Sequence, residues 1–546
     1  MKNLPPPPPL KTCVLVLSLF LLSMVVFETQ AKTPPRKKLN RKAKIINGTQ
    51  ATLAYQALLS TDPQNLTGGY HGGGVLISPN CILTAKHVID GGSSSLKAYV
   101  GITTRSQATN PLGISEKVTF TGGPDLGLIF LNSPIPNASP IKLASESNKT
   151  DWVAGKSLQV SGFGIETSSS TGVSADCKRV SVNASSITDP NMIVCIGPGT
   201  NDACQGDSGG PLVISGSSLL AGVVSTDLFG NSIPTGSAKN NCGKGGRYVK
   251  VSKYLDWIVE RIFINDAAKA PSKICAGQSV TFTNLPIVPD GCTFTWEASP
   301  SNLFAATSNT NNSTTFTVTA ASNIGGLATI KLTFTAPDLS IKEVYKTIWV
   351  GRPGTIDITT DGTFNLMGNS ASVCRTFGYS MTASTIPEMG ITDYTWTGWG
   401  NINAFFAPST TNGGIAQNKI SFGNNTAGTY LFTIKAKNNC GDDNNPSTNT
   451  RMLYITVNNC GFRVFPNPAS TLLTIDYETP DKVESIPKKL ELIEEKSLKK
   501  VKEIVSNTKN NKHEINVSDL PRGIYYLKLS YGNDKKSDDN IKIILQ

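Results

Sequence analysis

Short hydrophobic runs that alternate with polar residues recur through most of this chain of 546 residues. Runs such as 280–282, 330–334 and 430–434 are rich in Val, Ile, Thr, Phe and Tyr, and Gly, Asn or Pro residues separate one run from the next. Alternation with a period of two residues is typical of half-buried β-strands. In the first half of the chain, the spacing of apolar residues favours a helix best over 251–259. The pattern therefore predicts an all-β chain with few helices.

The N-terminal segment has a different residue pattern, with basic residues around one long apolar run. An apolar run over 14–27 follows basic residues and precedes a short stretch that ends at Ala31. This layout predicts a secretory signal peptide over 1–31. The alternative is a membrane anchor, but the run is shorter than the roughly 20 residues that a spanning helix needs. Residues 32–44 are rich in Pro, Lys and Arg and are expected to form a pro-segment.

The net charge of +11 is concentrated at this end. Residues 1–44 contain nine Lys and Arg residues and one acid, so they account for +8 and leave +3 for the rest of the chain. A basic stripe with interleaved aromatic residues does not occur later in the sequence, which excludes nucleic acid as a partner. No later run is long and apolar enough to suggest a membrane span in the mature form.

A chain of this length is usually too long to fold around one hydrophobic core, so several domains are expected. We place a β-rich domain at 45–265, two Ig-like β-sandwich modules at 268–352 and 355–459, and a last β-rich unit at 461–546. Ten of the eleven cysteines follow the predicted signal peptide. In an exported chain, their wide spacing favours disulfides over a metal site. We expect neither a metal nor an organic cofactor.

Candidate chemistry lies in three motifs of the first domain. Residues 206–211 read Gly-Asp-Ser-Gly-Gly-Pro, so glycines flank Ser208 and let a substrate backbone come close to its hydroxyl. The same turn is able to aim the backbone N–H groups of Gly206 and Ser208 at a developing oxyanion. His87 and Asp125 precede this turn, in one of the chain orders known for Ser-His-Asp triads. Together the motifs predict acyl transfer by a serine nucleophile.

With these motifs, residues 45–265 resemble the trypsin/chymotrypsin family. The resemblance implies a fold of two six-stranded β-barrels with the active site between them. It also implies the roles of the three residues: Ser208 is the nucleophile, His87 the general base, and Asp125 the carboxylate that orients the imidazole.

The resemblance also implies a pocket for the side chain that precedes the scissile bond. Asp202 matches the base of this S1 pocket in trypsin-like members, where a carboxylate selects Arg or Lys. Gly246 matches a wall glycine of the pocket, and Ser225 and Asp227 are also expected to contribute to S1. The segment after Ser225 departs from the family pattern, because Thr226-Asp227 replaces Trp-Gly. Asp227 would either narrow the rim of the pocket or favour basic substrates.

A control mechanism follows from the same resemblance. Cleavage after Lys44 would free the α-amino group of Ile45, and in the family that ammonium pairs with the residue that matches Asp207. The chain would therefore be made as a zymogen. The family also implies the disulfides Cys204–Cys242 and Cys177–Cys195.

The last unit, 461–546, resembles the C-terminal sorting domain of the bacterial type IX secretion system. The motif Val-Phe-Pro-Asn-Pro-Ala at 464–469 and the segment 520–527 carry the likeness. It implies export across the outer membrane, followed by release or surface attachment. The region before it looks like PKD/Ig-like modules, which implies the pairs Cys275–Cys292 and Cys374–Cys440.

These features together predict a secreted serine endopeptidase that cuts after Arg or Lys. Its expected partners are protein or peptide substrates, an activating protease and the secretion machinery. A second hypothesis is a catalytically idle adhesin or peptide-binding protein built on a protease scaffold. A third hypothesis keeps proteolysis and makes the two sandwich modules bind carbohydrate or a surface.

Overall fold

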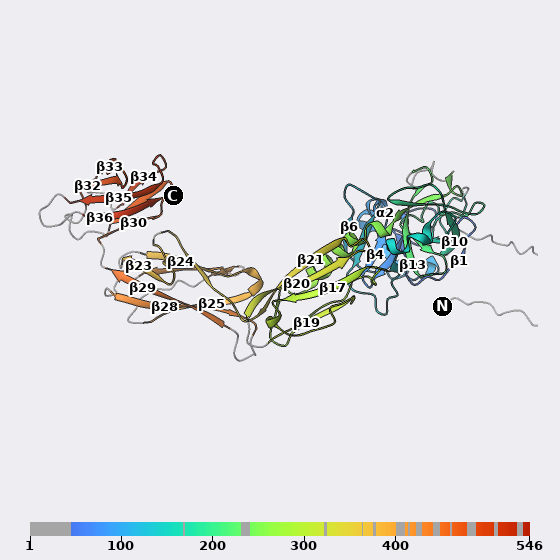
Figure 1. The fold of residues 1–546 in the computed structure, drawn as a ribbon, viewed down its shortest axis with the longest axis horizontal. Helices are drawn as coiled ribbons and strands as arrows, with labels where there is room; N and C mark the ends of the chain where they lie inside the picture. Colours follow the sequence, from blue (N-terminus) through green and yellow to red (C-terminus); the bar gives the residue numbers. More distant parts are fainter. Residues whose placement is uncertain are drawn as a thin grey trace, which may run out of the picture. The chain divides into compact units, whose positions relative to one another are not determined.

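The structure is a computed structural model. It describes residues 45–546 with these gaps: 168–169, 231–240, 322–324, 363, 375–377, 400–409, 413–414, 422–427, 441–447, 459–460, 478–486, 507–511 and 532–538. The predicted signal peptide, the pro-segment and Lys44 lie outside the described residues, as does Cys460. The elements are mostly strands (Figure 1), which confirms the all-β prediction. Among the described residues, no helix has the length and apolar character needed to cross a membrane.

The first domain begins with a six-stranded antiparallel sheet in the order β5-β2-β3-β4-β7-β6. Of its central strands, β2, β4 and β7 are buried along their whole length and β3 is buried except at His71, because runs such as Gly-Leu-Ile-Phe-Leu in β7 present apolar residues to both faces. The strands are β2 (Gln56–Ser60), β3 (His71–Ser78), β4 (Cys81–Thr84), β5 (Lys97–Val100), β6 (Ile114–Thr119) and β7 (Gly127–Leu131).

The second sheet of this domain closes on itself. Its order is β1-β10-β11-β14-β13-β12-β9, and an additional pairing of β10 with β9 completes a ring of six strands. The short β8 pairs with β13. The strands are β1 (Thr49–Gln50), β8 (Lys142–Leu143), β9 (Ser157–Gly162), β10 (Lys178–Ala184), β11 (Met192–Ile196), β12 (Pro211–Ile214), β13 (Leu219–Asp227) and β14 (Gly246–Lys250). The fold predicted for this domain is therefore confirmed, with the second sheet closed as a six-stranded barrel and the first sheet forming a half-barrel.

Among the described residues, two α-helices accompany these sheets. The short α2 (Lys86–Gly92) follows β4 directly and includes His87. The helix predicted over 251–259 begins later, as α3 (Leu255–Lys269), because Val251–Lys253 forms a 3-10 turn. Buried apolar residues of α3 belong to the same hydrophobic cluster as the strands that follow it, and Phe263 stacks on Phe282 with ring centroids 5.6 Å apart.

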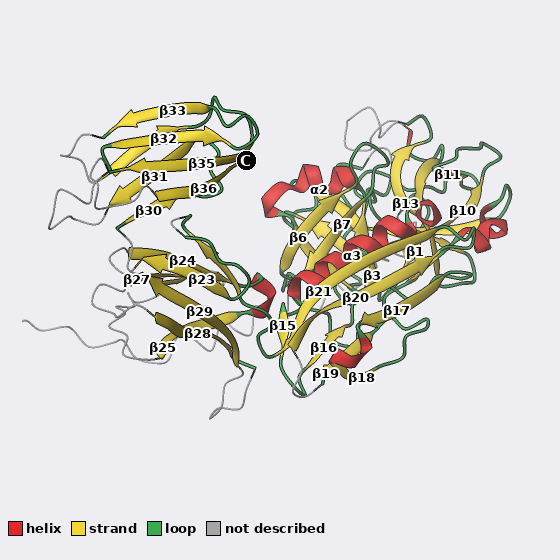
Figure 2. Ribbon diagram, turned by 60° about the vertical axis from the view of Figure 1, so that its left-hand side comes forward, coloured by secondary structure: helices red, strands yellow, loops and turns green. Residues whose placement is uncertain are grey.

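The rest of the chain consists of pairs of β-sheets (Figure 2). After α3 come the sheets β15-β21-β20-β17 and β16-β19-β18, then β22-β24-β27-β26 and β23-β29-β28-β25, and last β30-β31-β34 and β33-β32-β35-β36. The first pair consists of β15 (Lys273–Ile274), β16 (Ser279–Phe282), β17 (Thr293–Ser299), β18 (Phe304–Thr307), β19 (Phe316–Ala320), β20 (Gly325–Thr335) and β21 (Ile341–Gly351). The second consists of β22 (Asp357–Thr360), β23 (Ser370–Cys374), β24 (Gly378–Ser384), β25 (Ile391–Trp399), β26 (Thr410–Asn412), β27 (Ile415–Ser421), β28 (Gly428–Asn438) and β29 (Thr448–Asn458). The third consists of β30 (Phe462–Phe465), β31 (Leu472–Tyr477), β32 (Lys489–Glu494), β33 (Lys500–Val505), β34 (Lys512–Asn516), β35 (Gly523–Ser530) and β36 (Asp539–Leu545).

One predicted disulfide is present, and Cys204 is bonded to Cys242. The predicted pair Cys177–Cys195 is wrong, because both thiols are free and buried. Cys195 lies opposite Ala184 in the sheet. Ala184 is seven positions beyond Cys177, about 23 Å along an extended strand, which is too far for a bridge.

The predicted pair Cys275–Cys292 is also wrong. Cys275 is bonded to Cys440, and Cys292 is free. Cys275 follows β15 and Cys292 precedes β17, and these two strands form opposite edges of one four-stranded sheet. Three strand spacings, about 14 Å, separate such edges. The bond to Cys440 also excludes the predicted pair Cys374–Cys440.

Candidate active site

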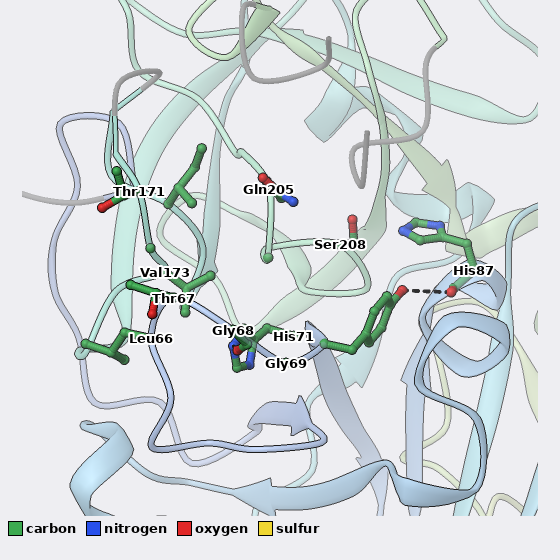
Figure 3. Close-up of a pocket in the computed structure, with 14 residues that line it drawn as sticks. Leu66, Thr67, Gly68, Gly69, His71, His87, Thr171, Val173, Gln205 and Ser208 are labelled. Atoms are coloured by element: carbon green, nitrogen blue, oxygen red, sulfur yellow. Dashed lines mark hydrogen bonds between the residues drawn. The ribbon is translucent and has the colours of Figure 1, made fainter. Parts of the chain in front are cut away.

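The candidate site is a pocket to which both sheets of the first domain contribute (Figure 3). His87 and the segment before β3 come from the first sheet, whereas Gln205, Gly206 and Ser208 come from the loop before β12 of the second. The residues that line it are Leu66, Thr67, Gly68, Gly69, Tyr70, His71, His87, Ile165, Thr171, Gly172, Val173, Gln205, Gly206 and Ser208.

Strand pairing brings His87 and Asp125 together. In the antiparallel pair of β4 and β7, Thr84 lies opposite Gly127, so the residues just after β4 meet those just before β7. Asp125 Oδ1 accepts a hydrogen bond from the backbone N–H of His87 at 2.9 Å, and Oδ2 lies 2.7 Å from His87 Nδ1. Two contacts between the same residues fix the plane of the imidazole.

Asp125 is held as a carboxylate. Burial alone would raise the pKa of Asp125, but hydrogen bonds from His87 and from the hydroxyl of Ser225, at 2.7 Å, leave this pKa below its usual value. An ionised carboxylate accepts hydrogen bonds only, so Nδ1 of His87 carries the proton. Nε2 is then an acceptor, and it has no hydrogen-bond partner among the described residues.

Ser208 lies across the pocket from this imidazole. Figure 3 shows the ring of His87 directed toward the Ser208 hydroxyl. The loop is held in place by Gly73, whose N–H donates to the Ser208 carbonyl at 2.6 Å. Gly209 has a φ of +82°, and a side chain there would collide with Thr84 Oγ1 and the Gly73 carbonyl. The glycine after the serine is therefore required by both conformation and space.

Two backbone donors of this loop are unoccupied. The N–H groups of Gly206 and Ser208 form no hydrogen bond in the described part of the chain. Gly206 has a φ of +92°, a conformation that favours glycine. Free N–H groups on both sides of Asp207 are suited to bind an oxyanion beside Ser208.

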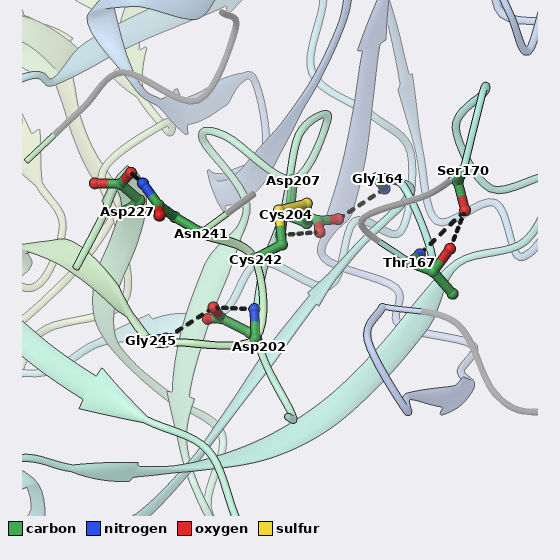
Figure 4. The surroundings of a disulfide bond; sticks show 11 residues. Gly164, Thr167, Ser170, Asp202, Cys204, Asp207, Asp227, Asn241, Cys242 and Gly245 are labelled. Carbon is green, nitrogen blue, oxygen red and sulfur yellow. Dashed lines mark hydrogen bonds between the residues drawn. A yellow bond between two sulfur atoms is a disulfide. The ribbon is translucent and has the colours of Figure 1, made fainter. Parts of the chain in front are cut away.

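Asp207 is fully buried beneath this loop. Its carboxylate accepts hydrogen bonds from Gly164 N–H at 2.7 Å and from Cys204 N–H at 2.9 Å (Figure 4). Burial raises the pKa of Asp207 from 3.8 to about 7 in spite of these two donors. Ile45 is also completely buried. The chain thus contains a buried carboxylate that an additional cation would stabilise.

A second cavity lies beside the loop, next to the Cys204–Cys242 disulfide. Its lining residues are Asp202, Ala203, Val224, Thr226, Asp227, Asn241, Cys242, Gly245, Gly246 and Tyr248. Asp202 Oδ2 accepts from the N–H of Gly243 at 2.9 Å. It also accepts from the N–H of Gly245 at 3.0 Å (Figure 4). Oδ1 has no hydrogen-bond partner among the described residues, and burial raises the pKa of Asp202 to about 6. The free oxygen is suited to a ligand cation.

Asp227 lies at the wall of the same cavity, opposite Gly246 in the pairing of β13 with β14. Its carboxylate accepts from the N–H of Phe229 at 2.9 Å and from the Asn241 amide at 2.7 Å. The structure thus brings together three of the four residues predicted for S1. The Ser225 side chain is not among the lining residues, because its hydroxyl donates to Asp125.

Sequence reasoning missed two aromatic residues of the site. The Tyr70 hydroxyl donates to the backbone carbonyl of His87 at 2.8 Å, and the buried Tyr248 hydroxyl, beside Asp202, has no hydrogen-bond partner in the described structure. Neither tyrosine belongs to a motif, and only its position in the fold brings it to the site.

Comparison with known proteins gives matches in two regions. The trypsin family model matches residues 45–258, and the model of a secretion system C-terminal sorting domain matches residues 463–546. A trypsin from Saccharopolyspora erythraea is 30% identical over 228 residues, which cover 38% of this chain and 91% of that protein. Trypsin alpha from Drosophila melanogaster is 29% identical over 265 residues, which cover 44% of this chain and 95% of that protein. The solved structure of the Vibrio cholerae VesB protease covers 56% of this chain and 100% of its own, at 18% identity and a TM-score of 0.34, which is too low to support an inference.

Proposed function

The chain belongs to the trypsin family of serine proteases, and we propose that it is an endopeptidase whose catalytic triad is Ser208, His87 and Asp125. The sorting domain at 463–546 indicates export, to the cell surface or the medium, in a bacterium. One observation carries the proposal. His87 is bonded to Asp125 through Nδ1 at 2.7 Å, while its Nε2 has no hydrogen-bond partner among the described residues and faces Ser208 across the pocket.

The proposed reaction uses these groups in sequence. Nε2 of His87 takes the proton of the Ser208 hydroxyl as Oγ attacks the carbonyl carbon of the substrate. The carbonyl oxygen becomes an oxyanion, which the N–H groups of Gly206 and Ser208 stabilise. The imidazolium then gives its proton to the leaving amine, and Asp125 stabilises the positive charge meanwhile. Water enters by the same base catalysis, hydrolyses the acyl-enzyme and restores the Ser208 hydroxyl.

The proposed specificity is for Arg or Lys before the scissile bond. Its support is the buried Asp202, whose Oδ1 has no partner in the described structure and is therefore available to a cation. An apolar side chain in this cavity would leave that carboxylate buried without a counter-charge, which is costly. Asp227 adds a second carboxylate to the wall. A hydrogen bond from the Asn241 amide holds this carboxylate at the edge of the cavity.

We further propose that the chain is a zymogen. Cleavage after Lys44 would give Ile45 an α-ammonium group, and the buried carboxylate of Asp207 would be its partner. The burial of Ile45 and the raised pKa of Asp207 support this pairing.

Cleavage profiling on a peptide library tests the proposed specificity. The protein processed before Ile45 should cut after Arg or Lys, and Ser208→Ala should cut nothing. Asp202→Asn, which keeps the shape of the side chain, should lose the preference for basic residues. Cleavage after Leu or Phe by the wild type would contradict the role given to Asp202. A folded, processed wild type that cuts no peptide would favour the idle-scaffold hypothesis.

A further inference from the structure

Arg105 is a buried cation of the first domain that no catalytic motif includes. It lies in a 3-10 turn (Arg105–Gln107) after β5, and its side chain is only 1% exposed. No carboxylate forms an ion pair with it among the described residues. Its guanidinium donates instead to backbone carbonyls, from Nε to Ser174 at 2.7 Å, from Nη2 to Phe163 at 3.2 Å and from Nη1 to Pro63 at 3.3 Å.

His71 occupies the remaining side of Arg105. His71 Nε2 lies 2.9 Å from the Asn65 carbonyl and 2.8 Å from the Gly68 carbonyl, so Nε2 carries the proton. Nδ1 is therefore an acceptor, and it lies 3.3 Å from Arg105 Nη1. Burial and the charge of Arg105 lower the pKa of His71, which keeps the ring neutral. Every group that shares a hydrogen bond with the guanidinium is thus a neutral acceptor, and the carboxylate with which it interacts electrostatically is that of Asp207.

A single peptide group connects this cation to Asp207. The carbonyl of Phe163 accepts from Arg105, and the N–H of the same peptide, that of Gly164, donates to Asp207 Oδ1 at 2.7 Å. Hydrogen bonds at both ends of one amide polarise it and strengthen each other. The close packing also restricts the position of this peptide, because a Cβ atom at residue 164 would lie 2.5 Å from the Asp207 carboxyl carbon.

Asp207 lies between the two residues whose N–H groups are free to bind an oxyanion, Gly206 and Ser208. Its position therefore determines where these donors point. We propose that Arg105 is a positioning residue, which acts through the Phe163–Gly164 peptide on Asp207 and so keeps the oxyanion donors in place. The inference rests on the proposed function of the loop. Arg105 touches neither substrate nor nucleophile and is not itself catalytic.

The transition state should be more sensitive to this arrangement than the ground state. An oxyanion develops only as the serine attacks, so a displaced donor lowers kcat and leaves KM nearly unchanged. Lysine keeps the positive charge but is not able to reproduce the planar fork that serves three carbonyls. If geometry rather than charge alone is required, Arg105→Lys should fail to restore the activity that Arg105→Gln loses.

The test compares processed wild type with Arg105→Lys and Arg105→Gln, using the best substrate found by profiling. We expect kcat to fall about 10- to 100-fold in both variants, approaching the loss seen when an oxyanion donor is removed, while KM changes by less than about threefold. A peptide aldehyde forms a tetrahedral adduct that uses the donors, whereas the corresponding peptide alcohol does not. The Ki of the aldehyde should rise in parallel with the loss of kcat, and the Ki of the alcohol should stay constant.

Arg179→Gln is the matched control, because Arg179 is a half-buried arginine on β10 of the same domain. It should behave as wild type. Variant kcat values within about twofold of wild type would overturn this inference and leave the proposed function standing. So would a fall in the number of titratable active sites with an unchanged aldehyde Ki, since that outcome reports misfolding only. An inactive wild type would overturn the proposed function and this inference together.

The wild-type chain provides a readout that needs no variant. The Gly164 amide hydrogen should exchange as slowly as those of β9, because it is buried in a hydrogen bond to Asp207 while Arg105 binds the carbonyl of the same peptide. Exchange as fast as that of an exposed turn would overturn the inference even if neither variant folds.

Discussion

At the scale of single residues, a few hydrogen bonds decide which nitrogen of His87 carries the proton. Asp125 accepts from the backbone and from the ring of this histidine, and Ser225 donates to the same carboxylate oxygen as the ring. The lone pair of Nε2 therefore faces the nucleophile without a competing donor among the described residues.

Asp125→Asn should remove this control of the tautomer. The amide NH₂ of asparagine would favour the wrong tautomer of His87, so we expect kcat to fall about 10⁴-fold with little change in KM. Steady-state kinetics of the processed protein measures the effect. Asp256→Asn, at an exposed position of α3, is the control and should retain full activity. A loss smaller than tenfold in Asp125→Asn would contradict the triad assignment.

The pH dependence of ligand binding should report on Asp202. Burial raises the pKa of Asp202 to about 6, and only the ionised form attracts a cation. Benzamidine binding to Ser208→Ala should therefore be strong at pH 8 and weaken about tenfold for each pH unit below the Asp202 pKa. Calorimetric titration measures the dissociation constant. Binding to the double variant with Asp202→Asn should be weak at every pH, and equal binding by both proteins would contradict the role of Asp202.

Residues in continuous motifs were predictable from the sequence, whereas those that act across the fold were not. Ser208, His87 and Asp202 stand in segments whose local chemistry identifies them. Tyr70 contacts His87, and Arg105 contacts Phe163, only because loops distant in sequence converge there. For the same reason, no local pattern indicated that the hydroxyl of Ser225 contacts Asp125, and the role of Ser225 in S1 stays a prediction.

At the scale of elements, α3 is part of a core that continues into the sheets after it. Phe263 of α3 stacks on Phe282 of β16, and both residues contact Trp296 of β17. All three side chains are nearly inaccessible to solvent. The strands that follow the protease family match therefore cover one face of its last helix.

Phe282→Ala should lower the stability of the protease domain, although Phe282 lies outside that domain. Removing a buried phenylalanine costs about 3–5 kcal/mol, and we expect the temperature at which protease activity is lost to fall by about 5–15 °C. The measurement is residual activity after heating. Tyr345→Ala changes an exposed aromatic residue of β21 and should have little effect. An unchanged temperature in Phe282→Ala would show that α3 does not depend on this contact.

The period-two pattern predicted strands but not their neighbours, and this difference explains the disulfide errors. Alternation reports that one face of a strand is buried, and it does not report which strands pair. Cys275 and Cys292 are close in sequence, yet they lie at opposite edges of a sheet. The partner of Cys275 is 165 positions away, a separation that no local pattern encodes.

At the scale of the whole molecule, the chain combines a family catalytic domain with a sorting domain for export. An exported protease benefits from remaining inactive until it leaves the cell, and the proposed pairing of Ile45 with Asp207 provides such control. Ile45→Gly would shorten the buried side chain that anchors the new terminus. It should lose most activity after processing while the rest of the protein stays folded, as circular dichroism would verify. Full activity in that variant would refute the switch.

Activation should also change how stability depends on pH. In the uncut chain, the pKa of Asp207 is raised from 3.8 to about 7, so its contribution to stability is full below pH 3.8 and is lost as pH rises through 7. A free ammonium at Ile45 would compensate the ionised carboxylate. In Ser208→Ala, which is not able to digest itself, external cleavage after Lys44 should therefore raise the melting temperature more at pH 7.5 than at pH 5. Equal increases at both pH values, measured by calorimetry, would count against the pairing.

The most direct measurement is covalent labelling by a fluorophosphonate, which requires an activated serine beside an oxyanion site. In the full chain processed before Ile45, the account predicts one adduct, located by mass spectrometry on the peptide that contains Ser208. Labelling should disappear in Ser208→Ala. A folded, processed wild type that takes up no label, or a label that persists in Ser208→Ala, would contradict the central claim.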